Sequence, residues 1–263
     1  MKKILIALMA LAGVAAAETI VFDFGRTDEA AYKTSGAIVI GSGNAPYQAA
    51  ITLSGNLGSI TGSYTYTQAA SGGNFSNSAT LTTTEENGWK NHLTDMPTGW
   101  ESTFADGLTS QWNGSTGNTH TLTLTNLAGG YYDFSILGGY YGKDNLCESI
   151  TLTISGTGVD MSNTTWATYD IAGALSHPAQ GVATYKTTLT NGSADEGYTY
   201  DVSTIYVAEG ASLTLTLTGD TVAGHRTPLN GIKMTYTVPE PTTATLSLLA
   251  LAGLATRRRR KQA

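Results

Sequence analysis

The sequence predicts an all-β protein, an antiparallel β-sandwich of jelly-roll-like form, on three observations. Apolar and polar residues alternate with a period of two through most of the chain between residues 19 and 238. Thr, Tyr, Val and Ile, which favour strands, are enriched in these runs. Glycine, with 31 residues in the chain, marks the turns between them. A body of this length is too long for one small immunoglobulin-type domain, which favours the jelly-roll-like form.

The expected strands follow the alternation in chain order. They are residues 19–24, 37–40, 63–67, 120–127, 131–137, 149–155, 182–189, 203–208, 212–218 and 231–238. Where Leu and Thr alternate, leucines occupy one face and threonines the other, which suits a sheet buried on one side. In a pair such as Tyr131 and Tyr132, one ring must then point inward. The segment FADGLTSQW at 104–112 is the best helical candidate.

Residues 68–119 are the least regular part of the body, and they form a long excursion from the strand pattern. They contain Trp89, Trp100 and Trp112, three of the four tryptophans. Long loops on β scaffolds often carry binding sites, and an aromatic face beside hydrogen-bonding groups suits a sugar ring. These three tryptophans are therefore the candidate glycan-binding residues, with core packing as the alternative role for each.

The charge of the chain is distributed unevenly. Residues 18–238 contain 7 basic and 19 acidic residues, a net charge of −12, against −6 for the whole chain. Such a body repels nucleic acid and anionic lipid, so nucleic acid is not an expected partner. Scattered Asp side chains and backbone carbonyls could hold a structural calcium, although solvated surface acids are the default.

Familiar catalytic and metal-binding motifs are absent from the sequence. The four histidines have no i, i+2 or i, i+4 spacing, and there is no nucleophile elbow, P-loop or EF-hand pattern. Cys147, the only cysteine, is expected to be a packed small apolar residue and not a nucleophile. We therefore expect no catalytic residue, no metal site, no cofactor and no enzymatic activity. The alternatives are a polysaccharide hydrolase with a convergent carboxylate pair, or a purely structural or adhesive surface protein.

The N-terminus reads as an export signal at residues 1–17. Two lysines precede an apolar stretch, and Ala15–Ala17 offers a small-x-small cleavage pattern before Glu18. We therefore expect an exported protein whose body runs from residue 18 to residue 238.

The C-terminal tail, residues 239–263, has three parts: Pro239, Glu240 and Pro241, then an apolar segment at 242–256, then Arg257, Arg258, Arg259 and Arg260. This order resembles the PEP-CTERM sorting signal of Gram-negative bacteria. The resemblance implies recognition of residues 239–241 by an exosortase, a membrane-embedded transpeptidase, followed by delivery to the cell envelope, cell surface or extracellular space. The arginines suit a basic anchor on the cytoplasmic side. Fifteen helical residues reach about 22 Å, short of a hydrocarbon core of about 30 Å, which favours transient membrane contact before cleavage.

The body carries a weaker likeness. TIVFDFG at residues 19–25, TLTLTNLAGGYYDFSILGGY at 121–140 and LNGIKMTYTV at 229–238 resemble the strand and turn pattern of galactose-binding-like jelly rolls. Many modules of that fold bind carbohydrate, although fold does not fix function. The resulting expectation is a non-catalytic envelope or matrix protein that contacts polysaccharide.

Overall fold

The computed structural model divides the chain into two units: Glu18–Tyr236, and a second unit formed by the two termini, Met1–Ala17 with Thr237–Ala263. The structure describes residues 17–25, 34–41, 51–69, 99–104, 107–111, 118–141, 147–170, 175–176, 184–188, 195–222 and 225–239. The unit Glu18–Tyr236 contains the β-sheet core of the protein.

The described residues are mostly in strands, with almost no helix, which confirms the all-β prediction. The strands are β1 (Ala17–Phe24), β2 (Ile38–Ile40), β3 (Ile51–Asn56), β4 (Ser63–Ala69), β5 (Leu108–Gln111), β6 (Thr119–Leu127), β7 (Gly130–Tyr141), β8 (Ser149–Asp160), β9 (Thr165–Asp170), β10 (Leu175–Ser176), β11 (Thr184–Thr188), β12 (Asp195–Gly219), β13 (Arg226–Leu229) and β14 (Gly231–Thr237). A short 3₁₀ turn, η2, spans Ser102–Phe104.

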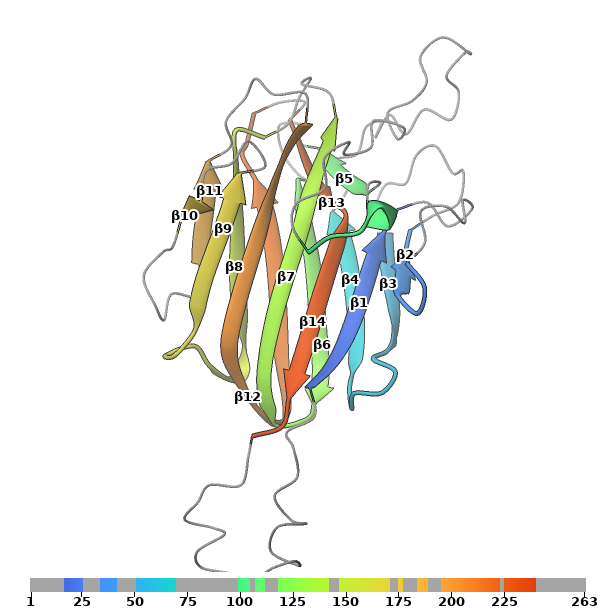
Figure 1. Cartoon of the computed structure of the whole chain (residues 1–263), viewed down its shortest axis with the longest axis vertical. Coiled ribbons are helices and arrows are strands. Elements are labelled where there is room, and N and C mark those ends of the chain that lie inside the picture. The colour runs from blue at the N-terminus through green and yellow to red at the C-terminus, as the bar shows by residue number, and fades with distance from the viewer. Residues whose placement is uncertain are drawn as a thin grey trace, which may run out of the picture. The chain divides into compact units, whose positions relative to one another are not determined.

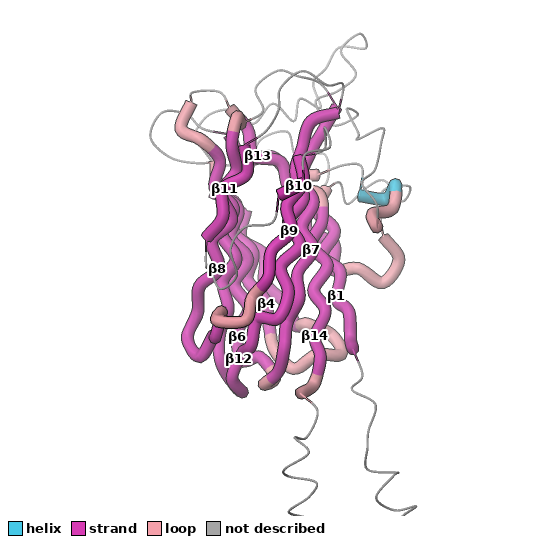
Figure 2. The backbone as a smooth tube through the Cα atoms, turned by 60° about the vertical axis from the view of Figure 1, so that its left-hand side comes forward, coloured by secondary structure: helices cyan, strands magenta, loops and turns pink. Residues whose placement is uncertain are grey.

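The strands form two layers that share one long strand, β12 (Figures 1 and 2). The first layer has the order β2-β1-β14-β7-β12-β9-β10, in which β12 contributes its first half. The second layer has the order β3-β4-β6-β12-β8-β11, in which β12 contributes its second half. The strand pairings that have a defined register are antiparallel except for β1 with β2, which is parallel. Strands β5 and β13 make a separate two-stranded ribbon.

Strand β12 passes from one layer to the other at residues 208–210. Residues 195–207 pair with β7, whereas residues 211–218 pair with β6. The pairing with β8 shifts register between Val207 and Ser212, and Gly210 has a φ of 71° there. That left-handed conformation is available to glycine without steric cost, which explains a glycine at the bend.

Strand β8 follows the same bend, and Gly156 makes the close approach possible. A Cβ atom at this position would lie 2.1 Å from the carbonyl oxygen of Ser212 on β12. Because that oxygen belongs to the backbone, it cannot move aside without shifting the strand. Glycine at 156 therefore lets β8 stay paired with β12 while both strands turn the corner.

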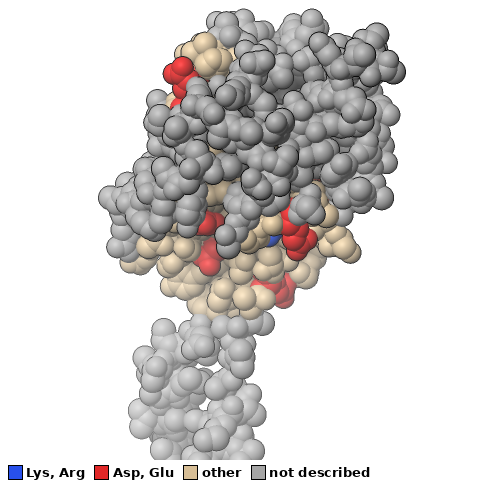
Figure 3. Space-filling view, turned by 45° about the horizontal axis from the view of Figure 1, so that its top comes forward, with Lys and Arg blue, Asp and Glu red and all other residues tan. Residues whose placement is uncertain are grey.

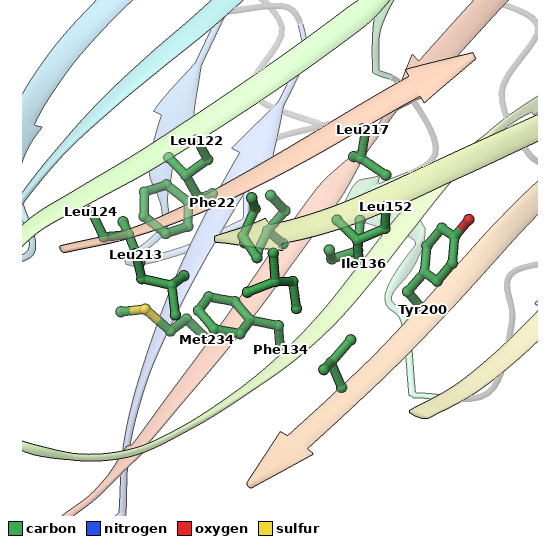
Figure 4. Close-up of a cluster of buried hydrophobic side chains, with 14 of the residues drawn as sticks. Phe22, Leu122, Leu124, Phe134, Ile136, Leu152, Tyr200, Leu213, Leu217 and Met234 are labelled. Atoms are coloured by element: carbon green, nitrogen blue, oxygen red, sulfur yellow. The ribbon is translucent and has the colours of Figure 1, made fainter. Parts of the chain in front are cut away.

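The core fills the space between the two layers, and alternation places its side chains there. On β6 the buried residues include Leu122 and Leu124, which face Leu215 and Leu213 across the strand pair. Aromatic residues from the first layer, including Phe22 and Phe134, complete the cluster (Figure 4). The leucines of the Leu-Thr runs are thus core residues, as the sequence predicts.

The threonines of the same runs cover the outer face of the second layer. Hydroxyl groups of neighbouring strands meet there: Thr123 with Thr214 at 3.3 Å between the oxygens, and Ser63 with Thr125 at 2.9 Å. No described outward side chain on β3, β4, β6, residues 149–159 of β8 or residues 211–218 of β12 carries a charge. This face is an uncharged, hydroxyl-rich surface on an acidic protein.

Each of the ten expected strands overlaps an observed strand, two of them the same strand β12, but the predicted helix is wrong. Residues 108–111 of that segment form β5, and within the described part of the chain only Ser102–Phe104 makes a helical turn. The sequence analysis also missed β3, β9, β10, β13 and the first part of β12. Tyr132 is buried and Tyr131 is exposed, which confirms that one ring of this pair points inward.

Within the described residues, no helix is long and apolar enough to cross a membrane.

Candidate functional site

Three polar side chains from separate strand ends meet in the unit Glu18–Tyr236. Cys147 precedes β8, Asp220 follows β12 and His225 precedes β13. Because β8 and β12 are antiparallel, with Ile150 opposite Gly219, the start of one strand lies beside the end of the other. A thiol sulfur, a carboxylate oxygen and an imidazole nitrogen consequently lie within 4.8 Å of one another. We refer to these three residues as the Cys–Asp–His cluster.

The carboxylate of Asp220 is held by several donors. The backbone N–H of Glu148 donates to it at 2.6 Å and that of Val222 at 3.0 Å, while His225 Nδ1 lies 2.9 Å and 3.0 Å from its two oxygens. A carboxylate only accepts, so Nδ1 carries the proton. Partial burial raises the pKa of Asp220, but the hydrogen bonds from His225, Val222 and Glu148 outweigh it, and this pKa lies below its ordinary value. Asp220 is therefore an ionised, oriented acceptor.

Cys147 is completely buried and belongs to the hydrophobic core cluster, as expected, but polar side chains also contact its sulfur. The side-chain amide of Asn118 donates to Cys147 Sγ at 3.1 Å, and Thr227 Oγ1 lies 3.5 Å from the sulfur. Burial raises the pKa of the thiol, which outweighs the opposing effect of these hydrogen bonds. A nucleophilic cysteine needs a lowered pKa and a base directed at its sulfur. In this cluster His225 Nδ1 faces Asp220, and among the described residues the hydrogen-bond partners of the Cys147 sulfur are Asn118 and Thr227.

Buried polar side chains behind the cluster fix the ribbon strand β13 against the two layers. Thr227 Oγ1 donates to the Asn118 side chain, and the Tyr198 hydroxyl donates to the carbonyl of Pro228. Asn230 accepts from the backbone N–H of Gly139 at 2.8 Å. These bonds satisfy polar groups that the interior would otherwise leave without partners, and they hold Thr227 next to Cys147.

His120 belongs to this polar interior, and its ring is held in one tautomer. Its Nε2 lies 2.7 Å from the carbonyl oxygen of Thr227, which can only accept, so Nε2 carries the proton. Its Nδ1 then accepts from the Tyr66 hydroxyl at 2.7 Å. Burial lowers the pKa of His120 to about 4, so the ring is neutral at physiological pH.

Of the three candidate glycan-binding tryptophans, the structure describes Trp100 alone; Trp89 and Trp112 lie outside the described residues. Trp100 is half-buried and packs edge-on against Phe104, with ring centroids 5.0 Å apart. The Nζ atom of Lys233 lies 4.5 Å from the centroid of the Trp100 ring, and Gly231 leaves room for the ring on β14. Trp100 therefore helps to fasten η2 to the first layer, a packing role that leaves only part of its surface for a ligand.

A second aromatic site lies on the outer face of the first layer. Tyr131 on β7 and Tyr206 on β12 stand opposite each other, each 39% exposed, with ring centroids 5.5 Å apart. Across the next strand pair, Asp160 on β8 stands opposite Tyr206. Tyr131, Tyr206 and Asp160 thus form one row across three strands, which we call the tyrosine row. The strand bulge beside it holds Thr204 at a φ of 67°, with its N–H donating to Asp133 at 2.7 Å.

Comparison with known proteins identifies one segment of the chain. Residues 237–261 match the family model described as the PEP-CTERM protein-sorting motif. The chain carries a PEP-CTERM sorting signal. The match indicates an exported, surface-sorted protein that passes through the membrane for processing by an exosortase. Comparison with curated proteins gives no match, and the galactose-binding-like resemblance of the body has no support from a relative.

Most residues of the sorting signal lie outside the described part of the chain. Pro239 is the last described residue and is exposed, whereas Glu240, Pro241 and Arg257–Arg260 lie beyond it. Residues 1–16 of the export signal at 1–17 also lie outside the described residues, whereas Ala17 is the first residue of β1. The identity of the tail therefore rests on its sequence pattern and on the family match.

Sequence reasoning missed both the Cys–Asp–His cluster and the tyrosine row. Cys147 and Asp220 are 73 residues apart in the sequence, so no local spacing reveals the cluster. Only the pairing of β8 with β12 brings them together. Tyr206 and Tyr131 both lie in expected strands. The register between β7 and β12 places the two residues opposite each other, and alternation alone does not define that register.

Proposed function

We propose that this exported, surface-sorted protein is a non-catalytic component of the cell envelope or extracellular matrix that contacts polysaccharide. The tyrosine row is the observation that supports this proposal. Tyr131 and Tyr206 each present a partly exposed ring, and Asp160 adds a carboxylate that can accept hydrogen bonds from sugar hydroxyls. An aromatic surface beside a hydrogen-bond acceptor suits the apolar face and the hydroxyl groups of a pyranose.

The charge of the body favours an uncharged polysaccharide over an acidic one. In Figure 3 the described part of the visible face carries acidic side chains in several places and little basic surface. An anionic polymer would meet repulsion from the net charge of −12 between residues 18 and 238. The uncharged hydroxyl face of the second layer adds a surface that imposes no such repulsion.

Replacing Tyr131 or Tyr206 with alanine is expected to weaken binding to a neutral polysaccharide such as dextran by about two- to tenfold. The estimate comes from a stacking contribution of about 0.5–1.5 kcal/mol for each ring. Affinity electrophoresis of the purified full chain, in gels with and without the polymer, measures the change. Each single site is expected to bind at about millimolar strength, so the effect depends on many copies facing a repeating polymer.

Matched variants separate stacking from other effects. Tyr131→Phe and Tyr206→Phe keep the rings and should retain most of the binding, while Val222→Ala alters an exposed apolar side chain outside the row and should change nothing. If the alanine variants bind as well as the unchanged chain, or if Trp100→Ala alone abolishes binding per folded molecule, the tyrosine row is not the site. Hydrolysis of the polymer by the purified chain would contradict the non-catalytic part of the proposal.

Replacing Pro239 and Pro241 together with alanine is expected to block processing of the tail. In a host with an exosortase, intact-mass measurement should show that the unchanged surface form begins at Glu18 and lacks Arg257–Arg260, whereas the variant remains uncleaved in the membrane fraction. Val238→Ala, an exposed position just before the motif, is the control and should be processed normally. Surface protein that still carries the four arginines would show that the sorting signal is not used.

A further inference from the structure

We propose that the Cys–Asp–His cluster is a binding site for a zinc-class divalent cation, with three protein ligands and at least one coordination position left to water. The three ligand atoms are Cys147 Sγ, an Asp220 carboxylate oxygen and His225 Nδ1, which lie within 4.8 Å of one another. This inference is independent of the proposed polysaccharide contact, because none of the three residues belongs to the tyrosine row.

The mixture of ligand types points to the class of cation. Zinc binds thiolate sulfur, imidazole nitrogen and carboxylate oxygen at about 2.0–2.3 Å, and sites with three protein ligands keep an open position for water. Calcium and magnesium take oxygen ligands almost exclusively. A sulfur and a nitrogen in a set of three therefore favour zinc, or a metal of similar preference such as cobalt, over the structural calcium that acidic composition suggests.

The distances already approach those of a bound state. His225 Nδ1 and Asp220 Oδ1 are 2.9 Å apart, a separation that two ligands of one small cation can adopt. The sulfur lies within 4.8 Å of both of these atoms, and a rotation about the Cys147 side chain changes its distance to them. Coordination replaces the thiol proton, which leaves to solvent, and moves the imidazole proton from Nδ1 to Nε2.

The surrounding contacts orient the ligands, as the outer contacts of metal sites do. The Asn118 amide donates to the sulfur at 3.1 Å, a bond that a thiolate would strengthen. The backbone N–H groups of Glu148 and Val222 hold the Asp220 carboxylate at 2.6 Å and 3.0 Å. The side chains of His225 and Asp220 are 18% and 15% exposed, so solvent reaches the imidazole and the carboxylate although the sulfur is buried.

The test titrates the purified full chain, without a polyhistidine tag and after treatment with a chelator, with Zn²⁺ and Co²⁺. We expect one zinc ion per chain at micromolar affinity or tighter, together with a rise in melting temperature. Cobalt should produce the visible absorption of a four-coordinate site and a near-ultraviolet band from sulfur-to-cobalt charge transfer. Saturation of the same site by Ca²⁺ or Mg²⁺, or the absence of any cobalt spectrum, would overturn the proposal.

Variants identify the ligands. In Cys147→Ser the charge-transfer band should vanish, and His225→Gln and Asp220→Asn should each lower zinc affinity by more than about 100-fold, beyond the range seen for outer contacts. Glu148→Gln is the matched control, because it keeps the backbone N–H that holds Asp220 and removes only an exposed side-chain charge nearby, and it should bind zinc within about twofold of the unchanged chain. An equal loss in Glu148→Gln and Asp220→Asn would mean that the cation is held by surface charge alone. If Cys147→Ser unfolds, the ligand assignment is judged on His225→Gln. Unchanged far-ultraviolet circular dichroism of His225→Gln shows that this variant is folded.

Discussion

Leu213→Ala is expected to lower the free energy of unfolding by about 2–5 kcal/mol, the range for removing a large aliphatic side chain from a packed core. Leu213 is fully buried on the second half of β12, opposite Leu124 on β6, and it lies between the two layers (Figure 4). Because β12 is paired on both sides there, its backbone cannot collapse into the space that the leucine leaves. The cost should therefore include the cavity as well as the lost burial of apolar surface.

The adjacent residue provides the control. Thr214 points to the outer face, where its hydroxyl meets that of Thr123 at 3.3 Å. Thr214→Ala should change the free energy of unfolding by less than about 1 kcal/mol, since the site stays solvated and the lost hydrogen bond is weak. Urea denaturation of the full chain measures both. Equal effects of the two substitutions would mean that the faces of β12 are not divided into core and surface as described.

This contrast between neighbours shows why the fold class could be predicted from the sequence. A period of two places Leu213 and Thr214 on opposite faces in any strand, whatever its partners are. The pattern does not show which strand each strand pairs with. Strand β12 was expected as two separate strands at 203–208 and 212–218, because Glu209 and Gly210 interrupt the alternation. The two segments are one bent strand, since glycines at 156 and 210 let β8 and β12 turn the corner together.

The failures of local prediction have the same origin. Residues 104–112 show a weak helical pattern, yet Leu108–Gln111 pair with β13, and this tertiary pairing overrides the local preference. The tail, by contrast, could be recognised because all of its parts are contiguous in the sequence, and the family match at residues 237–261 supports it. The Cys–Asp–His cluster and the tyrosine row could not, because each depends on the register between strands far apart in the chain.

Acid is expected to destabilise the protein by about 3 kcal/mol as the pH falls from about 6.5 to 4, and His120 is the cause. Burial lowers the pKa of this residue from 6.5 to about 4 in the folded chain. Below pH 6.5 the unfolded chain therefore takes up a proton that the folded chain does not, so protonation favours unfolding. Each unit of pKa difference is worth about 1.4 kcal/mol, and the stability is fully present above pH 6.5 and is lost through this window.

His120→Gln should remove most of this pH dependence, although the variant will be less stable at pH 7.5. Glutamine cannot reproduce both ring contacts, Nε2 to the Thr227 carbonyl and Nδ1 to the Tyr66 hydroxyl, and an unsatisfied buried group costs about 1–3 kcal/mol. Leu122→Ala, two residues along the same strand, is the control because it loses core packing and leaves the titrating ring in place. Urea midpoints at pH 7.5, 6.5, 5.5 and 4.5 should fall steeply with acid for the unchanged chain and for Leu122→Ala, but only slightly for His120→Gln. A pH dependence that survives in His120→Gln would assign the acid sensitivity to other groups and show that His120 is not held in its neutral form by the fold.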